Sequence, residues 1–153
     1  PAVLSGQPEV GNKKYGFMLK RMLSHSVPEI SPEQVQRYDS WVVLDARGKS
    51  EFEVSRIQDA KWVGYDNFDF ESVKDLNRDQ PIIIYCSIGY RSEKIAEQLI
   101  AKDFKYVFNL YGGIFEWKNQ GYPVFKDDEE TDKVHGFSKM WGIWLNKGTK
   151  VFE

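Results

Sequence analysis

The chain has 153 residues, of which 41% are hydrophobic and 15% aromatic, so it has the composition of one globular domain and not of a disordered polypeptide. The formal net charge is −2, and without a basic excess we predict no nucleic-acid partner. A single cysteine excludes an intramolecular disulfide and a multi-cysteine zinc site, and no run of about 18 apolar residues could span a bilayer.

The first half of the chain reads as short elements separated by turns. Residues 1–12 are rich in glycine, proline and polar side chains and are expected to form a loose arm. Apolar residues recur at helical spacing over 13–24 and predict a helix packed on the domain. The elements expected next are an extended piece over 27–30, a helix over 31–39 capped by Ser31, a strand over 41–44, a short helix over 50–54, a short strand over 60–63 and a helix over 71–76 with Asp69 as its cap.

The second half continues this alternation of strands and helices. The elements expected here are a strand over 82–85, a helix over 93–102, a strand over 106–110 and a helix over 114–119. Counting the piece at 27–30, there are five strands, and their alternation with helices predicts an α/β fold with a mainly parallel sheet.

The last segment carries two further predictions. Residues 126–132 are charged and are expected to form a solvated connector. Residues 134–145 place five apolar side chains on one helical face and predict a C-terminal helix; these are Val134, Phe137, Trp141, Trp144 and Leu145. That helix either packs back on the domain or offers its tryptophans to a protein partner or a second copy of the chain.

The strongest chemical signal lies at 82–92. An apolar strand ends in Cys86, a loop containing Gly89 and Arg91 follows, and a helix begins near Ser92. This order places a thiol where backbone N–H groups and the positive end of a helix dipole converge, which favours a reactive thiolate. A lone cysteine is more often a small buried apolar residue, but the carboxyl edge of a parallel sheet is where ligands bind.

Other motifs stand in a fixed order around this loop. They are VVLDAR (42–47), the stretch from EF (51–52) to Gly64, YGGIFEW (111–117) and GYPV (121–124). Together with the cysteine loop they resemble the rhodanese-like superfamily of sulfurtransferases, in its single-domain form, over about residues 30–124. One departure is SRI (55–57), where that family usually reads Gly-His-Ile; DA (59–60) likewise replaces Gly-Ala.

The resemblance implies a three-layer α/β/α fold with a five-stranded, mainly parallel sheet in the order 1-5-4-2-3, plus extra N- and C-terminal helices. The expected organisation is an N-terminal arm and helix over 1–26, the rhodanese-like domain over 27–125, and the charged link with the C-terminal helix over 126–153.

The resemblance also implies roles for the loop. Cys86 is the catalytic residue, and a cradle for the transferred sulfur is formed by Ser87, Ile88, Gly89, Tyr90 and Arg91. The spacing is Cys-x4-Arg, one residue shorter than the Cys-x5-Arg loop with which cysteine phosphatases wrap a phosphate. Arg91 either attracts an anionic donor or ties down the loop through carbonyl groups.

Other polar residues are expected to support the loop. Asp45 and Arg47 follow a strand end and are predicted to form a structural ion pair, because a carboxylate beside the thiol would oppose thiolate formation. Ser92 is predicted as the helix N-cap, with a hydrogen bond to sulfur as the alternative. The pair at 112–113 makes either a tight turn or a backbone wall beside the loop. His25 and His135 lie outside the resemblance and support neither a Cys–His dyad nor a metal site.

The predicted function is therefore that of a thiosulfate sulfurtransferase-like enzyme. Sulfane sulfur would pass from a small anionic donor of the thiosulfate type to a thiol or cyanide, through a persulfide on Cys86, without a metal or organic cofactor. The alternatives are a non-catalytic sulfur carrier or interaction module and, third, a cysteine phosphatase or arsenate reductase. The compartment is unknown: the cytoplasm is favoured, but the chain begins Pro1-Ala2 without methionine, so a cleaved signal peptide stays open.

Overall fold

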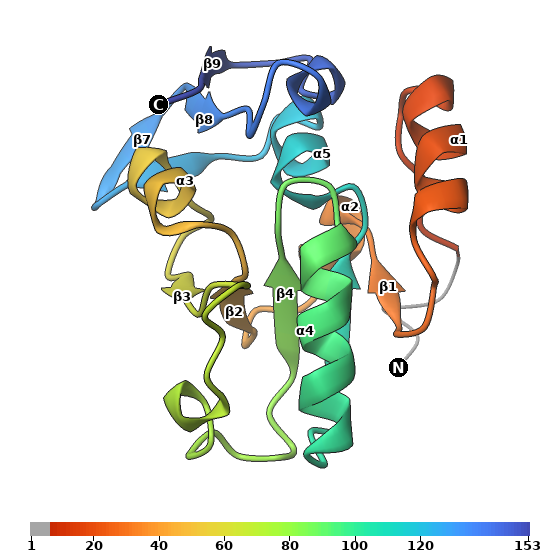
Figure 1. Cartoon of the computed structure of the whole chain (residues 1–153), viewed down its shortest axis with the longest axis vertical. Helices are drawn as coiled ribbons and strands as arrows, with labels where there is room; N and C mark the ends of the chain where they lie inside the picture. The colour runs from red at the N-terminus through yellow and green to blue at the C-terminus, as the bar shows by residue number, and fades with distance from the viewer. Residues whose placement is uncertain (1–6) are drawn as a thin grey trace.

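A computed structural model describes residues 7–153, in which a five-stranded sheet runs through the middle of the molecule (Figure 1). The strands are β1 (Glu29–Ile30), β2 (Val42–Asp45), β3 (Lys61–Trp62), β4 (Ile82–Tyr85) and β5 (Val107–Leu110). They lie in the order β1-β5-β4-β2-β3, and each neighbouring pair is parallel. The predicted sheet and its order are confirmed.

Five helices precede, connect or follow these strands in residues 7–153. They are α1 (Lys13–Met22), α2 (Pro32–Val35), α3 (Lys49–Val54), α4 (Tyr90–Ala101) and α5 (Gly113–Asn119), with 3-10 turns η2 (Phe70–Ser72) and η3 (Trp141–Trp144). The helix predicted over 31–39 is only one turn long, although it has the predicted capping box between Ser31 and Gln34. The helix predicted over 71–76 is reduced to η2, which Asp69 caps. None of the helices in residues 7–153 is long and apolar enough to cross a membrane.

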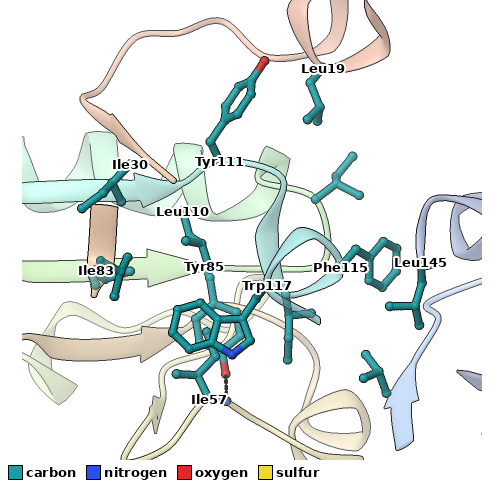
Figure 2. Close-up of a cluster of buried hydrophobic side chains, with 14 of the residues drawn as sticks. Leu19, Ile30, Ile57, Ile83, Tyr85, Leu110, Tyr111, Phe115, Trp117 and Leu145 are labelled. Carbon is teal, nitrogen blue, oxygen red and sulfur yellow. Dashed lines mark hydrogen bonds between the residues drawn. The ribbon is translucent and has the colours of Figure 1, made fainter. Parts of the chain in front are cut away.

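The central strand β4 separates two hydrophobic clusters because successive side chains point to opposite faces of a sheet. Ile82 and Ile84 pack in a cluster with the buried residues of α4. Ile83 and Tyr85 face the other side, toward a cluster that includes residues of α1, α2 and α5 (Figure 2). Full burial of each isoleucine side chain contributes about 1.5–3 kcal/mol. The fold is thus the predicted three-layer α/β/α arrangement.

The predicted C-terminal helix over 134–145 is wrong. The chain forms β8 (Lys133–His135), then η3, then β9 (Thr149–Val151), with β8 and β9 parallel. The ring of Phe152 lies so close to Gly136 that a Cβ there would be 2.6 Å from a ring carbon. Phe137 adopts a φ of +67°, which a right-handed helix does not allow. The helix therefore cannot run through these two positions.

This segment nevertheless packs on the domain. Val134 and Leu145 are fully buried in the same cluster as Tyr15 of α1. The ring of Trp144 stacks on that of Tyr15, with 5.2 Å between ring centroids. The apolar spacing therefore predicted the burial of Val134 and Leu145 correctly, but Phe137 is exposed and the residues belong to other elements.

The expected connector over 126–132 is also ordered. It belongs to an antiparallel hairpin of β6 (Val124–Lys126) and β7 (Glu129–Thr131), which turns at Asp127 with a φ of +53°. Most of its side chains are exposed, which fits the predicted solvation. The sequence has no apolar alternation that would predict these strands, because a hairpin at the surface buries few side chains.

Candidate active site

Cys86 lies directly after β4, at the carboxyl edge of the sheet. All four residues of β4 are buried, since helices cover both faces, and the strand brings the thiol to the edge where ligands bind in open α/β sheets. Cys86 is only 1% exposed, yet it lines a pocket of about 400 Å³. The thiol is therefore shielded from bulk solvent and faces this pocket.

The loop after Cys86 turns a backbone N–H toward the sulfur. Gly89 adopts a φ of +118°, which side-chain-bearing residues rarely adopt, and its N–H donates to Cys86 Sγ over 3.1 Å. Helix α4 begins at the next residue and is 12 residues long, so the positive end of its dipole lies at the loop. Both features direct positive potential toward the sulfur.

The predicted N-cap role of Ser92 is wrong, because Gly89 occupies the cap position and Ser92 lies inside α4. Ser92 Oγ lies 3.5 Å from Cys86 Sγ but 2.6 Å from Asn109 Oδ1. Asn109 Nδ2 donates to the Gly89 carbonyl over 2.9 Å, which fixes the amide and makes Oδ1 the acceptor. The Ser92 hydroxyl has one proton, and it is donated to Asn109 Oδ1, which is closer than the sulfur. Ser92 and Asn109 therefore hold the loop in place.

Asn109 was not predicted as part of the site. It is a fully buried amide in β5, where its neighbours Phe108 and Leu110 are apolar. A polar residue inside an apolar strand needs hydrogen-bond partners. A polar residue in this apolar strand was therefore the one sequence feature that could have indicated a role for Asn109.

Arg91 is bound to Glu51 of α3. Its two terminal nitrogens donate to the two carboxylate oxygens, each over 2.9 Å, and Nη2 also donates to Ser87 Oγ over 3.0 Å. The ring of Phe137 lies over the guanidinium, with Cζ 4.8 Å from the ring centroid. Arg91 thus connects the loop to α3 and to the C-terminal segment.

Glu51 is the partner that sequence reasoning missed. Its Oε2 also accepts the N–H of Gly48, and its Oε1 accepts the hydroxyl of Ser87. Burial alone would raise the pKa of Glu51, but the hydrogen bonds and the positive charge of Arg91 outweigh it and hold that pKa below its ordinary value. The charge of Arg91 is therefore largely compensated within the protein. Glu51 is the first residue of the EF motif, and the sequence assigned no role to its carboxylate.

Asp45 and Arg47 form a fully buried ion pair, with 2.7 Å between Arg47 Nη2 and Asp45 Oδ2. The same carboxylate oxygen accepts the hydroxyl of Tyr85 over 2.6 Å, and Arg47 Nη2 donates to the carbonyl of Ser55 over 2.7 Å. These bonds join the ends of β2 and β4 to the segment after α3. The arrangement suits a structural pair and not a general base at the thiol.

The glycine pair at 112–113 forms a backbone wall against the loop. Gly113 has a φ of +62°, and a Cβ there would lie 2.3 Å from the Ser87 carbonyl oxygen. The N–H groups of Ile114 and Phe115 donate to the carbonyls of Cys86 and Ser87 over 2.9 and 3.2 Å. The start of α5 therefore fixes the two residues that begin the loop.

The remaining predicted loop residues differ in position. Ser87, Ile88, Tyr90 and Arg91 line the pocket together with Cys86. Ile88 is buried, whereas Tyr90 is exposed at the rim.

Half of the pocket wall comes from residues that were not predicted to be in the site. Met22 is the last residue of α1, Tyr65 and Asp66 follow β3, and Phe137 and Trp141 belong to the C-terminal segment. The sequence pattern had assigned Phe137 and Trp141 to a helix face.

His135, to which the sequence assigned no role in a dyad or a metal site, lies near the charges of Glu51 and Arg91. It belongs to β8, which packs on α3, and its Nδ1 accepts the N–H of Phe137 over 2.9 Å. Burial lowers the pKa of His135 below its ordinary value, and the nearby charge of Glu51 only partly opposes this. Neutral His135 therefore holds the backbone of Phe137, the residue that covers Arg91.

The chain is similar in sequence to proteins named as a thiosulfate sulfurtransferase and as a tRNA hydroxylase. Thiosulfate sulfurtransferase GlpE from Coxiella burnetii is 27% identical over 94 residues, which are 56% of this chain and 87% of that protein. tRNA uridine(34) hydroxylase from Cytophaga hutchinsonii is 35% identical over 83 residues, which are 52% of this chain. The match spans only 27% of the hydroxylase, so it relates this chain to one part of that protein.

Solved structures show the same fold. The rhodanese-like domain of Alr3790 from Anabaena has a TM-score of 0.59 at 18% identity, covering 67% of this chain and 83% of that one. Thiosulfate sulfurtransferase from Pseudomonas aeruginosa also has a TM-score of 0.59, at 22% identity, covering 65% of this chain and 20% of that one. The family model of the rhodanese-like domain matches residues 31–120, which is more than half of the chain. The chain therefore belongs to the rhodanese-like domain family.

Proposed function

We propose that this chain is a sulfurtransferase that moves sulfane sulfur through a persulfide on Cys86. The observation that carries the proposal is the position of Cys86 Sγ, which faces a pocket, accepts the N–H of Gly89 and lies at the start of α4. A thiolate in such a place is a nucleophile, and an added sulfur would lie near the N–H of Gly89 and the start of α4. The similarity to a relative named as a thiosulfate sulfurtransferase supports this chemistry.

The reaction would proceed in two displacements. The Cys86 thiolate attacks the outer sulfur of a thiosulfate-type donor, the donor S–S bond breaks, and sulfite leaves with the electron pair. A thiol or cyanide then attacks the outer sulfur of the persulfide and releases the Cys86 thiolate. Such a covalent intermediate predicts ping-pong kinetics. Neither displacement needs a metal or an organic cofactor.

Other residues would support these steps from their positions in the structure. The backbone of residues 87–91 would surround the outer sulfur, and Asp45 with Arg47 would hold the strand ends beneath it. Arg91 would act mainly by fixing the loop, because Glu51 and Ser87 already accept its hydrogen bonds.

The test is intact-mass spectrometry of the protein after incubation with thiosulfate, and again after cyanide. We expect a gain of one sulfur atom that cyanide removes, and no gain in the Cys86→Ser variant. A protein that gains no sulfur although Cys86 can be alkylated would contradict thiosulfate as donor. A persulfide that forms but passes to no acceptor would indicate a sulfur carrier and not an enzyme.

A further inference from the structure

The pocket above Cys86 has an apolar, aromatic mouth. Phe137 and Trp141 line it from the C-terminal segment, and Met22 lines it from the end of α1. All three lie outside residues 31–120, the part matched by the family model. Phe137 is 46% exposed and Met22 is 36% exposed, although such side chains are costly to leave in water. Apolar side chains gathered beside a reactive thiol suit a ligand with an apolar body.

The charges in the pocket are unfavourable for a dianion. Among the described residues that line it, Arg91 is the one cation, and Glu51 binds it through both carboxylate oxygens. Asp66 adds a carboxylate to the wall. The start of α4 offers the equivalent of about half a positive charge, which suits one negative charge better than two. Moving a second negative charge from water into this apolar pocket would be costly.

We infer that the sulfur donor of this site is organic, with one negative charge at the reacting sulfur and an apolar body about the size of a ring. This inference rests on the proposed function and names its donor class. The outer sulfur of the donor would meet Cys86, while the body would lie against Phe137 and Trp141. The thiolate of Cys86 forms the new S–S bond, the S–S bond of the donor breaks, and an organic sulfinate or thiolate leaves with the electron pair.

Three sodium salts test the inference because they share the sulfur to be transferred. Benzenethiosulfonate has one charge and a ring, methanethiosulfonate has one charge and no ring, and thiosulfate has two charges and no ring. The measurement is kcat/KM for each donor, from thiocyanate formed with cyanide. Each ratio between donors is divided by the ratio that free glutathione gives with the same salts, which removes their intrinsic reactivity.

We expect the corrected ratio of benzenethiosulfonate to methanethiosulfonate to be about tenfold or more, the discrimination typical of a small apolar group in a pocket. Thiosulfate should be the poorest of the three. In the double variant Phe137→Ala/Trp141→Ala the ring preference should fall by about tenfold. The matched control Met140→Ala/Ile143→Ala removes exposed apolar side chains of the same segment that do not line the pocket, and it should keep the preference.

The outcomes separate the two proposals. Persulfide formation with no ring preference in the unaltered protein would overturn the donor class and leave the proposed function standing. A preference that survives Phe137→Ala/Trp141→Ala in a folded variant would overturn the role of this mouth. Failure of all three salts to load Cys86 would overturn the proposed function itself. If the double variant does not fold, the corrected ratio of benzenethiosulfonate to methanethiosulfonate in the unaltered protein still tests the donor class.

Discussion

Removing the Glu51 carboxylate should destabilise the protein strongly, because it leaves the charge of Arg91 without a carboxylate partner. Glu51 and Arg91 have side-chain exposures of 6% and 16%, and two parallel bonds of 2.9 Å join them. Removing one partner of a buried pair typically costs about 3–5 kcal/mol. Because Arg91 can still reach solvent, we expect the lower end, about 3 kcal/mol, for Glu51→Ala.

The assay is urea-induced unfolding of Glu51→Ala, Arg91→Ala and the double variant at neutral pH. The pair should couple by about 1–3 kcal/mol in this cycle. The matched control is the exposed pair of Glu71 and Lys74, which should couple by less than about 1 kcal/mol. A cost below about 1 kcal/mol for Glu51→Ala, or additive effects of the two substitutions, would refute the reasoning.

The same coupling should depend on pH in one direction. The pKa of Glu51 is lowered in the folded state, so the unfolded chain takes up this proton first as the pH falls. The stability that Glu51 contributes is therefore fully present above its ordinary pKa of 4.5 and is lost as the pH falls below it toward the folded value. The coupling between Glu51 and Arg91 should shrink over that range.

Three further outcomes are expected. Cys86→Ser should abolish sulfur loading in intact-mass spectra while its unfolding free energy changes by less than about 1 kcal/mol; loading in that variant would place the persulfide elsewhere. Gly113→Ala should cost more than about 2 kcal/mol in urea unfolding, because its Cβ would meet the Ser87 carbonyl, whereas Gly121→Ala, with a φ of +91° but open space, should cost only about 1 kcal/mol. Burial lowers the pKa of His135, so the unfolded chain binds its proton more readily, and the thermal midpoint should fall as the pH drops below 6.5; in His135→Asn, which keeps an acceptor for the N–H of Phe137, that part of the fall should disappear, and an unchanged pH profile would contradict it.

The sheet and the cysteine loop could be predicted because their signals are local. Strand β4 is a continuous apolar run that ends in Cys86, and the glycine and helix start follow within six residues. Such a run, bounded by turn residues, reads directly as a buried strand.

The partner of Arg91 could not be predicted in this way. Glu51 lies 40 residues away, and only the parallel pairing of β2 with β4 brings α3 beside the loop. A one-dimensional pattern shows that Glu51 is polar and lies in a short helix, but it does not show which cation it meets.

The C-terminal segment was misassigned for a different reason. Apolar residues at helical spacing also fit a strand followed by a tight turn, in which Val134 and Leu145 reach the core and Phe137 stays exposed. The close contact between Gly136 and Phe152 joins residues 16 positions apart, and the sequence pattern shows neither this contact nor the positive φ of Phe137. The sequence therefore could not predict that Phe137 and Trp141 line the pocket.

The parallel pair of β8 and β9 has a consequence for the order in which this protein is made. Val151 lies beside His135, and its carbonyl accepts the N–H of Gly136 over 2.8 Å. During synthesis from the N-terminus, the central sheet is complete in sequence once Leu110 has emerged, whereas Phe137 is fixed only when Val151 arrives. For that interval the nascent chain would carry Cys86 without the part of its pocket wall that Phe137 and Trp141 supply.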